Sequence, residues 1–392
     1  MKPAWLTIFL KEVRENLRDR KTVMNALVLG PLIGPVLMGL MMTAVVTRES
    51  KRAEKPLDLP VIGAEYAPTL IHHLRTQNIR IEPPPADPER VVRDQDEDVV
   101  LRIDAKFADS WRDGEPAALD LIYDSSHQDG ERALRRVENA IEGYGRLVGA
   151  LRLVARGIHP AIIRPIAAVD RDQASAEAKG GTMLSFLPYF LILGAFMGGM
   201  YLAIDTTAGE RERQSLEPLL ANPVPRWKIM AGKLFATAAF AIVSLLLTLV
   251  AFAIITPMLP LDKLGLKFNL GPMIFARMLL VLVPVVILAA SVQTLIAANA
   301  KSYREAQSWL GLLTLIPAIP SMLLMVIPVK PALWMFSVPL LAQHLSIMKL
   351  VRADTIASAE WAALLVSGLL LSGIVAYFAA RIYDREGLAV SA

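Results

Sequence analysis

The stretch from residue 210 to residue 233 is polar, lies between two long apolar segments, and combines two kinds of side chain that recognise protein surfaces. Acidic and basic residues alternate first, and leucines then follow at i, i+3 and i+4, on one edge of a short helix. Charges of this kind set the orientation of a partner more than its affinity. The residues predicted to make such a contact are Glu210, Arg211, Glu212, Arg213, Leu216, Glu217, Leu219, Leu220, Pro223 and Val224. On the pattern alone, a solvated helix resting on a bilayer surface is the commoner explanation.

A second group of polar side chains lies inside the long apolar segments or at their ends. Such residues are costly in a membrane and often mark the path of a transported molecule. The candidates are Gln293, Asn299, Asp205 and Thr206. Two alternatives stay open. Gln293 could form a hydrogen bond between helices. Asp205 could pair with Arg211 or Arg213 at a helix end.

The sequence lacks the motifs of self-contained enzymatic chemistry. It has no G-x-x-x-x-G-K-[ST] phosphate-binding loop, no H-E-x-x-H zinc motif and no G-x-S-x-G nucleophile motif. Its five histidines are scattered, and the absence of cysteine excludes disulfides and cysteine metal sites. We therefore expect no catalytic residue, no bound cofactor and no enzyme activity in this chain. The sequence leaves open whether a metal ion binds.

Long apolar segments must position both groups of residues. Of the 392 residues, 54% are hydrophobic, above the usual range of soluble domains. Six segments approach or exceed the roughly 20 residues that cross a bilayer. These predicted spans are residues 23–46, 183–204, 234–255, 273–298, 309–329 and 362–380. Residues 1–22 predict a cytoplasmic interfacial helix, with Trp5 and Ile8 opposite the basic side chains. Residues 330–355 are too often interrupted by polar residues and proline for a span, and a re-entrant segment fits them better, formed by a re-entrant or interfacial pair of short helices.

Residues 47–181 differ in composition from the rest of the chain. They contain 20 basic and 24 acidic residues, whereas the remainder contains 21 and 13. Strand-like runs at 57–62, 98–103 and 118–123 alternate with helical runs at 68–77 and 129–156. Residues 162–169 are either a further strand or an extended linker. A segment of about 130 residues can form its own core. The sequence therefore predicts an α/β domain inserted between the first and second spans.

The distribution of basic residues predicts the orientation of the spans. Basic residues gather in four places, at 2–21, 211–233, 301–304 and 381–385. With both termini in the cytoplasm, all four groups face the cytoplasm, as the positive-inside tendency requires. The inserted domain then faces outward. Because topology accounts for the basic excess of the membrane part, we expect lipid and no nucleic acid as a partner.

Two segments resemble a known family. Residues 9–22, with the sequence FLKEVRENLRDRKT, resemble the elbow segment of ABC type 2 exporter permeases. Residues 209–226, with the sequence GERERQSLEPLLANPVPR, and the following Gly232 and Lys233 resemble the first cytoplasmic loop of the same family. Within it the likeness is closest to the NatB sodium-export permeases. Gln214 stands where the family usually has glycine, and we expect this difference to lengthen the helix.

The resemblance implies an α-helical membrane protein with six spans and an inserted extracytoplasmic α/β domain, in the bacterial cytoplasmic (inner) membrane. It also implies that the loop at 205–233 supplies a coupling helix for a separate ABC ATPase subunit, which binds ATP and Mg. A second permease, either identical or paralogous, would complete a dimer. The implied activity is ATP-driven sodium extrusion.

Two other functions remain in competition with sodium extrusion. The first is export of drugs, peptides or lipid-like compounds, which would require a wide apolar opening in place of an ion-sized polar path. The second is a membrane sensor or scaffold whose outer domain binds a ligand and whose loop only recruits a partner. That function predicts ligand binding by the isolated residues 47–181 and no ATP-driven flux.

Overall fold

The computed structural model describes residues 3–163, 169, 171–259, 270–327 and 329–383. It consists of two compact units. The membrane unit comprises Met1–Ser50 and Gln173–Ala392, and the inserted unit comprises Lys51–Asp172. Each has its own cluster of buried apolar side chains.

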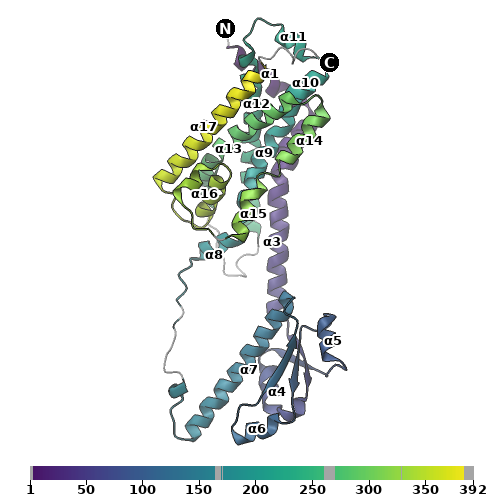
Figure 1. Ribbon diagram of the computed structural model, residues 1–392, viewed down its shortest axis with the longest axis vertical. Coiled ribbons are helices and arrows are strands. Elements are labelled where there is room, and N and C mark those ends of the chain that lie inside the picture. The colour runs from purple at the N-terminus through teal and green to yellow at the C-terminus, as the bar shows by residue number, and fades with distance from the viewer. Residues whose placement is uncertain (1–2, 164–168, 170, 260–269, 328, 384–392) are drawn as a thin grey trace. The chain divides into compact units, whose positions relative to one another are not determined.

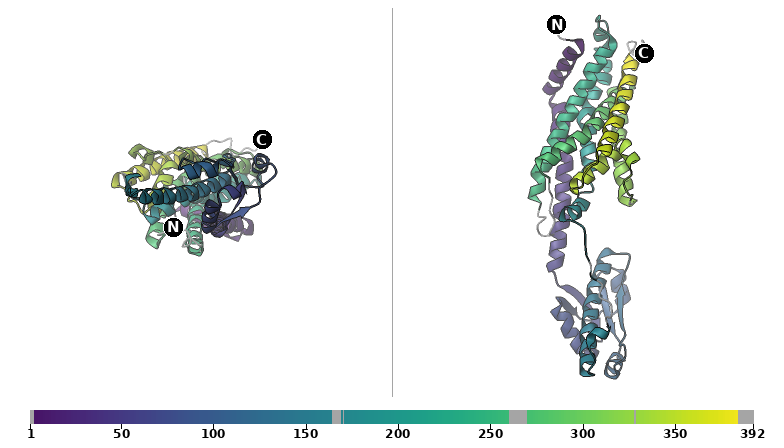
Figure 2. Two further views of the ribbon diagram at one scale, coloured as in Figure 1. Left: turned by 90° about the horizontal axis from the view of Figure 1, so that it is seen from below. Right: turned by 90° about the vertical axis from the view of Figure 1, so that its left-hand side faces the viewer.

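Long helices of the membrane unit run side by side as a bundle (Figures 1 and 2). Its centre is formed by α9, α12 and α13, which pack against one another, with α1 against α12 and α17 against α13. Two π-helical turns, Met24–Leu29 and Asp205–Gly209, interrupt the first and second long helices. The helices are α1 (Ala4–Arg18), α2 (Arg20–Val23), α3 (Gly30–Glu54), α8 (Ala176–Met183), α9 (Leu187–Ile204), α10 (Glu210–Glu212), α11 (Leu216–Leu220), α12 (Arg226–Ile255), α13 (Pro272–Asn299), α14 (Tyr303–Leu313), α15 (Ala318–Val326), α16 (Leu341–Val351) and α17 (Ser358–Tyr383).

Among the described residues, six helical stretches are long and apolar enough to cross a membrane. They are Arg20–Arg48, Leu187–Glu212, Arg226–Met258, Pro272–Asn299, Tyr303–Leu324 and Ser358–Arg381. Each overlaps one of the six predicted spans. The prediction succeeds because a run of about 20 apolar residues can satisfy its backbone polar groups in lipid only as a helix.

The fifth of these stretches differs from the continuous helix predicted over 309–329. It begins six residues earlier, at Tyr303, and is divided into α14 and α15 by a break at residues 314–317. Pro317 at the end of the break has no backbone N–H and disfavours a helical conformation of the residue before it.

The segment predicted to be re-entrant contains a 3₁₀ turn, Leu333–Ser337, and the short α16, whose side chains are mostly buried. The predicted pair of short helices is thus one turn and one helix.

The inserted unit contains a four-stranded sheet with the order β2-β1-β3-β4. β1 pairs in parallel with β2 and β3, whereas β4 is antiparallel to β3. The strands are β1 (Leu57–Ile62), β2 (Ile79–Glu82), β3 (Val99–Ile103) and β4 (Leu119–Tyr123), and the helices are α4 (Pro68–Thr76), α5 (Pro88–Arg93), α6 (Phe107–Asp113) and α7 (Gln128–Ala155).

Most secondary structure predicted for the inserted unit is confirmed, but β2 and the short helices α5 and α6 were missed. β2 has only four residues, Ile-Arg-Ile-Glu, a run too short to stand out by alternation alone. The strand or linker predicted for 162–169 begins in a 3₁₀ turn, Pro160–Ile163, and most of it lies outside the described residues.

Candidate coupling site

The polar loop between α9 and α12 has two parts with different environments. The loop root, defined here as residues 205–216, contains the second π-helical turn and the three-residue α10. The loop tip, defined as residues 218–225, follows on and includes most of α11. Gln214 has φ of 56°, in the left-handed region, and α10 ends at Glu212. The expectation that Gln214 would lengthen the helix is therefore wrong, because a left-handed residue ends a right-handed helix.

A buried ion pair fastens the loop root to the third long helix. The ammonium group of Lys233, on α12, is fully buried and donates hydrogen bonds to the Glu210 carboxylate and to the backbone carbonyl of Thr206. A buried charge of this kind is tolerated only when it is paired and its hydrogen bonds are satisfied. Lys233 thus ties the start of α12 to two positions on the loop root.

The elbow helix α1 extends this pair into a cluster. Lys11 Nζ lies 3.2 Å from Glu210 Oε1 and 3.2 Å from Glu12 Oε1. Glu12 itself is only 2% exposed. We call Lys11, Glu12, Glu210 and Lys233 the charge cluster. It contains two cations and two carboxyl groups from α1, α10 and α12, and Lys11 of α1 lies 199 residues before Glu210 of α10.

Burial changes the acidity of the two α1 groups in the charge cluster. Desolvation by burial raises the pKa of Glu12, although the neighbouring lysines oppose this shift. Burial acts to lower the pKa of Lys11, but the carboxylates of Glu12 and Glu210 outweigh it and raise that pKa overall. Lys11 therefore remains a cation, and Glu12 holds its proton to a higher pH than an exposed glutamate.

Close approach of two helices makes the cluster possible. A Cβ atom added at Gly232 would lie 2.8 Å from the Ile8 Cβ atom, closer than side chains pack. The buried face of α1 consists of Ile8, Glu12 and Asn16, at i, i+4 and i+8. Glycine at position 232 therefore lets α1 lie directly on α12, beside Lys233.

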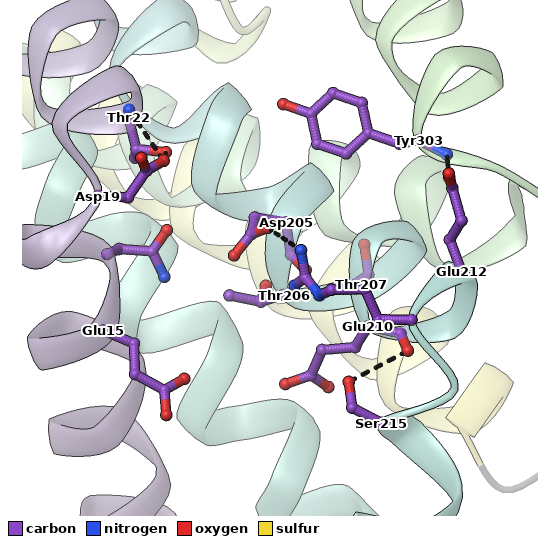
Figure 3. Close-up of polar contacts among 12 residues, drawn as sticks. Glu15, Asp19, Thr22, Asp205, Thr206, Thr207, Glu210, Glu212, Ser215 and Tyr303 are labelled. Atoms are coloured by element: carbon purple, nitrogen blue, oxygen red, sulfur yellow. Dashed lines mark hydrogen bonds and ion pairs between the residues drawn. The ribbon is translucent and has the colours of Figure 1, made fainter.

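Three other charges predicted for partner contact, those of Arg211, Glu212 and Arg213, are also bound within the chain. The Arg211 guanidinium donates to the Ala300 carbonyl at 2.9 Å. Glu212 accepts from the backbone nitrogen of Tyr303 at 2.8 Å, at the first turn of α14 (Figure 3). Arg213 pairs with Asp205 at 2.8 Å. The loop root thus contacts α12, α14 and the end of α13.

The leucine edge divides between the two parts of the loop. Leu216 is buried against Met230, Ala298 and Ala379. Leu219 is half-buried, Pro223 is exposed and Val224 is half-buried. The side chains of Glu217 and Leu220 lie outside the described part of the chain. Trp227, at the start of α12, is 53% exposed beside the loop tip.

The four candidate pathway residues are not brought together. Gln293 is buried on α13 and donates to the Phe196 carbonyl of α9, and its own carbonyl oxygen has no hydrogen-bond partner among the described residues. Thr206 bonds back to Leu202 and accepts from Lys233. Asp205 pairs with Arg213, as its alternative predicted, and Asn299 is exposed and bonds back to Leu295. Within the described residues, no group of three histidine, cysteine or acidic side chains is arranged to hold a metal ion.

Sequence reasoning missed three members of the charge cluster as site residues: Lys11, Glu12 and Lys233. The available signal was Lys233 itself, a lysine directly before a long apolar run and directly after a glycine. Its charge was counted only toward membrane topology. A lysine placed there can instead be buried by pairing, and that requires a partner from elsewhere in the sequence.

Comparison with known proteins decides the family. Residues 6–388 match the model of a family described as ABC-2 family transporter protein. The chain belongs to this family. It is also similar to the ABC transporter permease protein NatB of Bacillus subtilis (strain 168), with 28% identity over 318 residues that cover 80% of each chain. The resemblance found in the elbow and loop segments is confirmed. This ABC-2 chain is therefore a polytopic helical membrane protein and a transport component, of a family that works with an ATPase.

Proposed function

We propose that this chain is the membrane-spanning permease subunit of an ATP-driven exporter, coupled to a separate ATPase through residues 210–224. The observation that carries the proposal is the contrast within the loop. The loop root is fixed to α1, α12 and α14 by buried or backbone-directed contacts, whereas the loop tip exposes Pro218, Asn222 and Pro223. A rigidly attached loop with an exposed tip can transmit force applied by a partner.

The loop tip and the loop root have different roles in this coupling. The loop tip, with Leu219 and the neighbouring Trp227, contacts the ATPase, which binds ATP and Mg. The charge cluster carries the resulting movement into α1 and α12, because separating Lys233 from Glu210 would break a buried ion pair, which is costly. Both termini and the loop lie in the cytoplasm, and the inserted unit lies outside the bacterial inner membrane. Two such chains, or this chain and a paralogue, form the pathway.

Sodium is the proposed substrate, on the likeness to the NatB permease. The test is uptake of radiolabelled sodium into inverted vesicles that contain this chain and its ATPase partner. An ATPase variant that binds but does not hydrolyse ATP provides the blank. Uptake above the blank is expected. Equal uptake in both would contradict sodium extrusion.

A second candidate substrate is an amphipathic organic compound, and a specific observation favours it. The membrane unit contains a cavity of about 790 Å³ whose lining is mostly apolar, between α15, α16 and the start of α9. A volume of this size is typical of small-molecule sites and greatly exceeds a monovalent ion. ATPase activity stimulated by lipophilic compounds, without sodium uptake, is the outcome that this candidate predicts in the same vesicles.

A further inference from the structure

The cavity of about 790 Å³ has an apolar interior and a charged edge. Met322 and Leu324 of α15 line one side, and Leu345 and Met348 of α16 line another. The polar lining includes a hydrogen-bonded pair, Ser321 Oγ and His344 Nδ1, which lie 2.9 Å apart. The methionines are flexible and polarisable, so they can adapt to apolar ligands of different shapes.

Three charged residues line the cavity at and beyond the end of α16: Lys349, Arg352 and Asp354. Lys349 is already compensated, because its ammonium lies 2.6 Å and 2.7 Å from the two carboxylate oxygens of Glu360. It also lies over the Phe336 ring, 5.2 Å from the ring centroid. Lys349 is therefore bound within the fold and is a poor ligand-binding group.

Arg352 differs from Lys349 in its surroundings. Its side chain is exposed, and among the described residues no carboxylate lies within ion-pair distance of its guanidinium. A guanidinium binds carboxylate or phosphate through two parallel hydrogen bonds. Asp354 is likewise exposed, and its backbone N–H bonds to the Lys349 carbonyl. The edge of the cavity thus contains the Arg352 guanidinium, which has no described ion-pair partner, and the Asp354 carboxylate, which lines the same cavity.

We propose that this cavity binds an acyl amphiphile, with its chain between α15 and α16 and an anionic carboxylate or phosphate group at Arg352. The apolar lining accounts for the chain, and Arg352 accounts for the anionic group. α15 also presents exposed apolar side chains, including Ile319 and Leu323, outside the cavity lining, as expected of a helix that contacts lipid. An amphiphile dissolved in the bilayer would therefore be present at high local concentration beside the site. The inference makes the second candidate substrate class more specific. It rests on the proposed function only where it takes this ligand to be transported.

Binding is tested on the purified full-length chain in a neutral maltoside detergent, without ATPase or ATP. The first probe is a palmitate-type fatty acid with a photoreactive group in its chain, and the second is the same chain ending in an alcohol. We expect the acid to label residues of α15 and α16, as located by mass spectrometry of the labelled peptides. Labelling confined to other helices would overturn the site.

Two pairs of variants sharpen the test. Ala318→Phe fills the cavity, since Ala318 lines it, whereas Ile319→Phe changes the adjacent side chain, which is exposed and does not line it. Labelling by both probes should fall in Ala318→Phe alone. Arg352→Gln should weaken binding of the acid about tenfold and leave the alcohol unchanged, as expected for the loss of a charged hydrogen bond. Equal loss for both probes, or for neither, would overturn the role of Arg352.

Asp354→Asn distinguishes two sources of the anionic group. For a simple anion such as the fatty acid, removing the nearby carboxylate should leave binding equal or tighter. For a zwitterionic head, tested with a photoreactive lysophosphatidylethanolamine, the same change should weaken binding, because Asp354 would pair with the ammonium. Either pattern supports an anionic group at Arg352. Failure of all probes overturns this inference and leaves the exporter proposal intact, since neither ATP nor the ATPase is present.

Discussion

The loop root and the loop tip belong to the same polar stretch of sequence, yet they differ in burial and in their contacts with the bundle. At the loop root, Glu210 is 6% exposed and pairs with a fully buried lysine. At the loop tip, Pro218, Asn222 and Pro223 are exposed. The charges that looked best suited to a partner therefore hold the loop to its own bundle. The less charged tip is what remains available for contact.

The comparison has a physical basis in how ion pairs behave. An exposed pair such as Arg213 with Asp205 contributes little, because water and salt screen it. A buried pair is costly to form, but it is also costly to break from one side, because the remaining charge is left without a partner. The charge cluster therefore makes the loop root a rigid attachment more than a source of net stability.

Removing one side of the buried pair should have the largest effect. Glu210→Leu removes the carboxylate to which the buried Lys233 ammonium is bonded, and we expect the free energy of unfolding to fall by about 3–5 kcal/mol. Thermal unfolding in detergent and the yield of folded protein measure this. Glu212→Leu, which removes an exposed carboxylate, is the matched control.

A double variant separates pairing from general damage at the loop root. Glu210→Met together with Lys233→Met removes both charges and should recover most of the lost stability, because no uncompensated buried charge remains between them. If Glu210→Leu were as stable as Glu212→Leu, the assigned difference between a buried and an exposed carboxylate of the loop root would be wrong.

A change at the loop tip should leave folding intact and weaken partner binding. Leu219→Asp replaces a half-buried leucine with a charge, and the dissociation constant for the ATPase should rise at least about tenfold, as expected for losing a buried leucine contact. The double change Leu219→Asp with Leu220→Asp should abolish co-purification. Gln214→Asp, at an exposed position outside the tip, is the control. Retained co-purification of the double variant would remove the tip from the interface.

The charge cluster should also show a pH dependence that an exposed carboxylate lacks. Burial raises the pKa of Glu12, so the folded state holds its proton more tightly than the unfolded chain does. This contribution is complete below the unfolded value, about 4.3, and is lost as the pH rises through the folded-state pKa. The side chain in Glu12→Gln cannot lose a proton. The melting temperature of this variant, relative to that of the unmodified chain, should therefore increase as the pH rises.

The control for this pH experiment is Glu15→Gln, because Glu15 is largely exposed and lies 3.4 Å from the same Lys11. Its melting temperature should follow that of the unmodified chain over the same range. Identical pH profiles for Glu12→Gln and Glu15→Gln would show that burial at the charge cluster does not control the acidity of Glu12.

The smallest effect is expected at the turn after α10, within the loop root. Gln214 adopts φ of 56°, a conformation that glycine reaches without steric cost. Gln214→Gly should therefore raise stability slightly, by about 1 kcal/mol or less, with unchanged ATPase binding. Differential scanning calorimetry of Gln214→Gly tests this. The control is Ala221→Gly, because Ala221 does not adopt a left-handed conformation. A loss of stability in Gln214→Gly would show that its side chain contributes contacts that outweigh the backbone strain.

Much of the architecture followed from local sequence patterns. The six spans, the helix α7 and three of the four strands were predictable, because hydropathy and periodicity act over short stretches of chain. The fifth span was predicted as one helix, since a composition window does not register the break that Pro317 imposes at residues 314–317. The family was also recognisable from the elbow and loop segments alone.

The sequence by itself determined which segments enter the membrane, where a polar loop emerges between them, and which residues of that loop are charged. Only the tertiary structure decided which partner each charge has. Lys11, Glu210 and Lys233 meet because α1 packs on α12 at Gly232, and no spacing within the sequence encodes a contact between residues about 200 positions apart. Hydropathy is a sum over neighbouring residues, whereas the energy of an ion pair depends on the distance and burial that the whole fold creates.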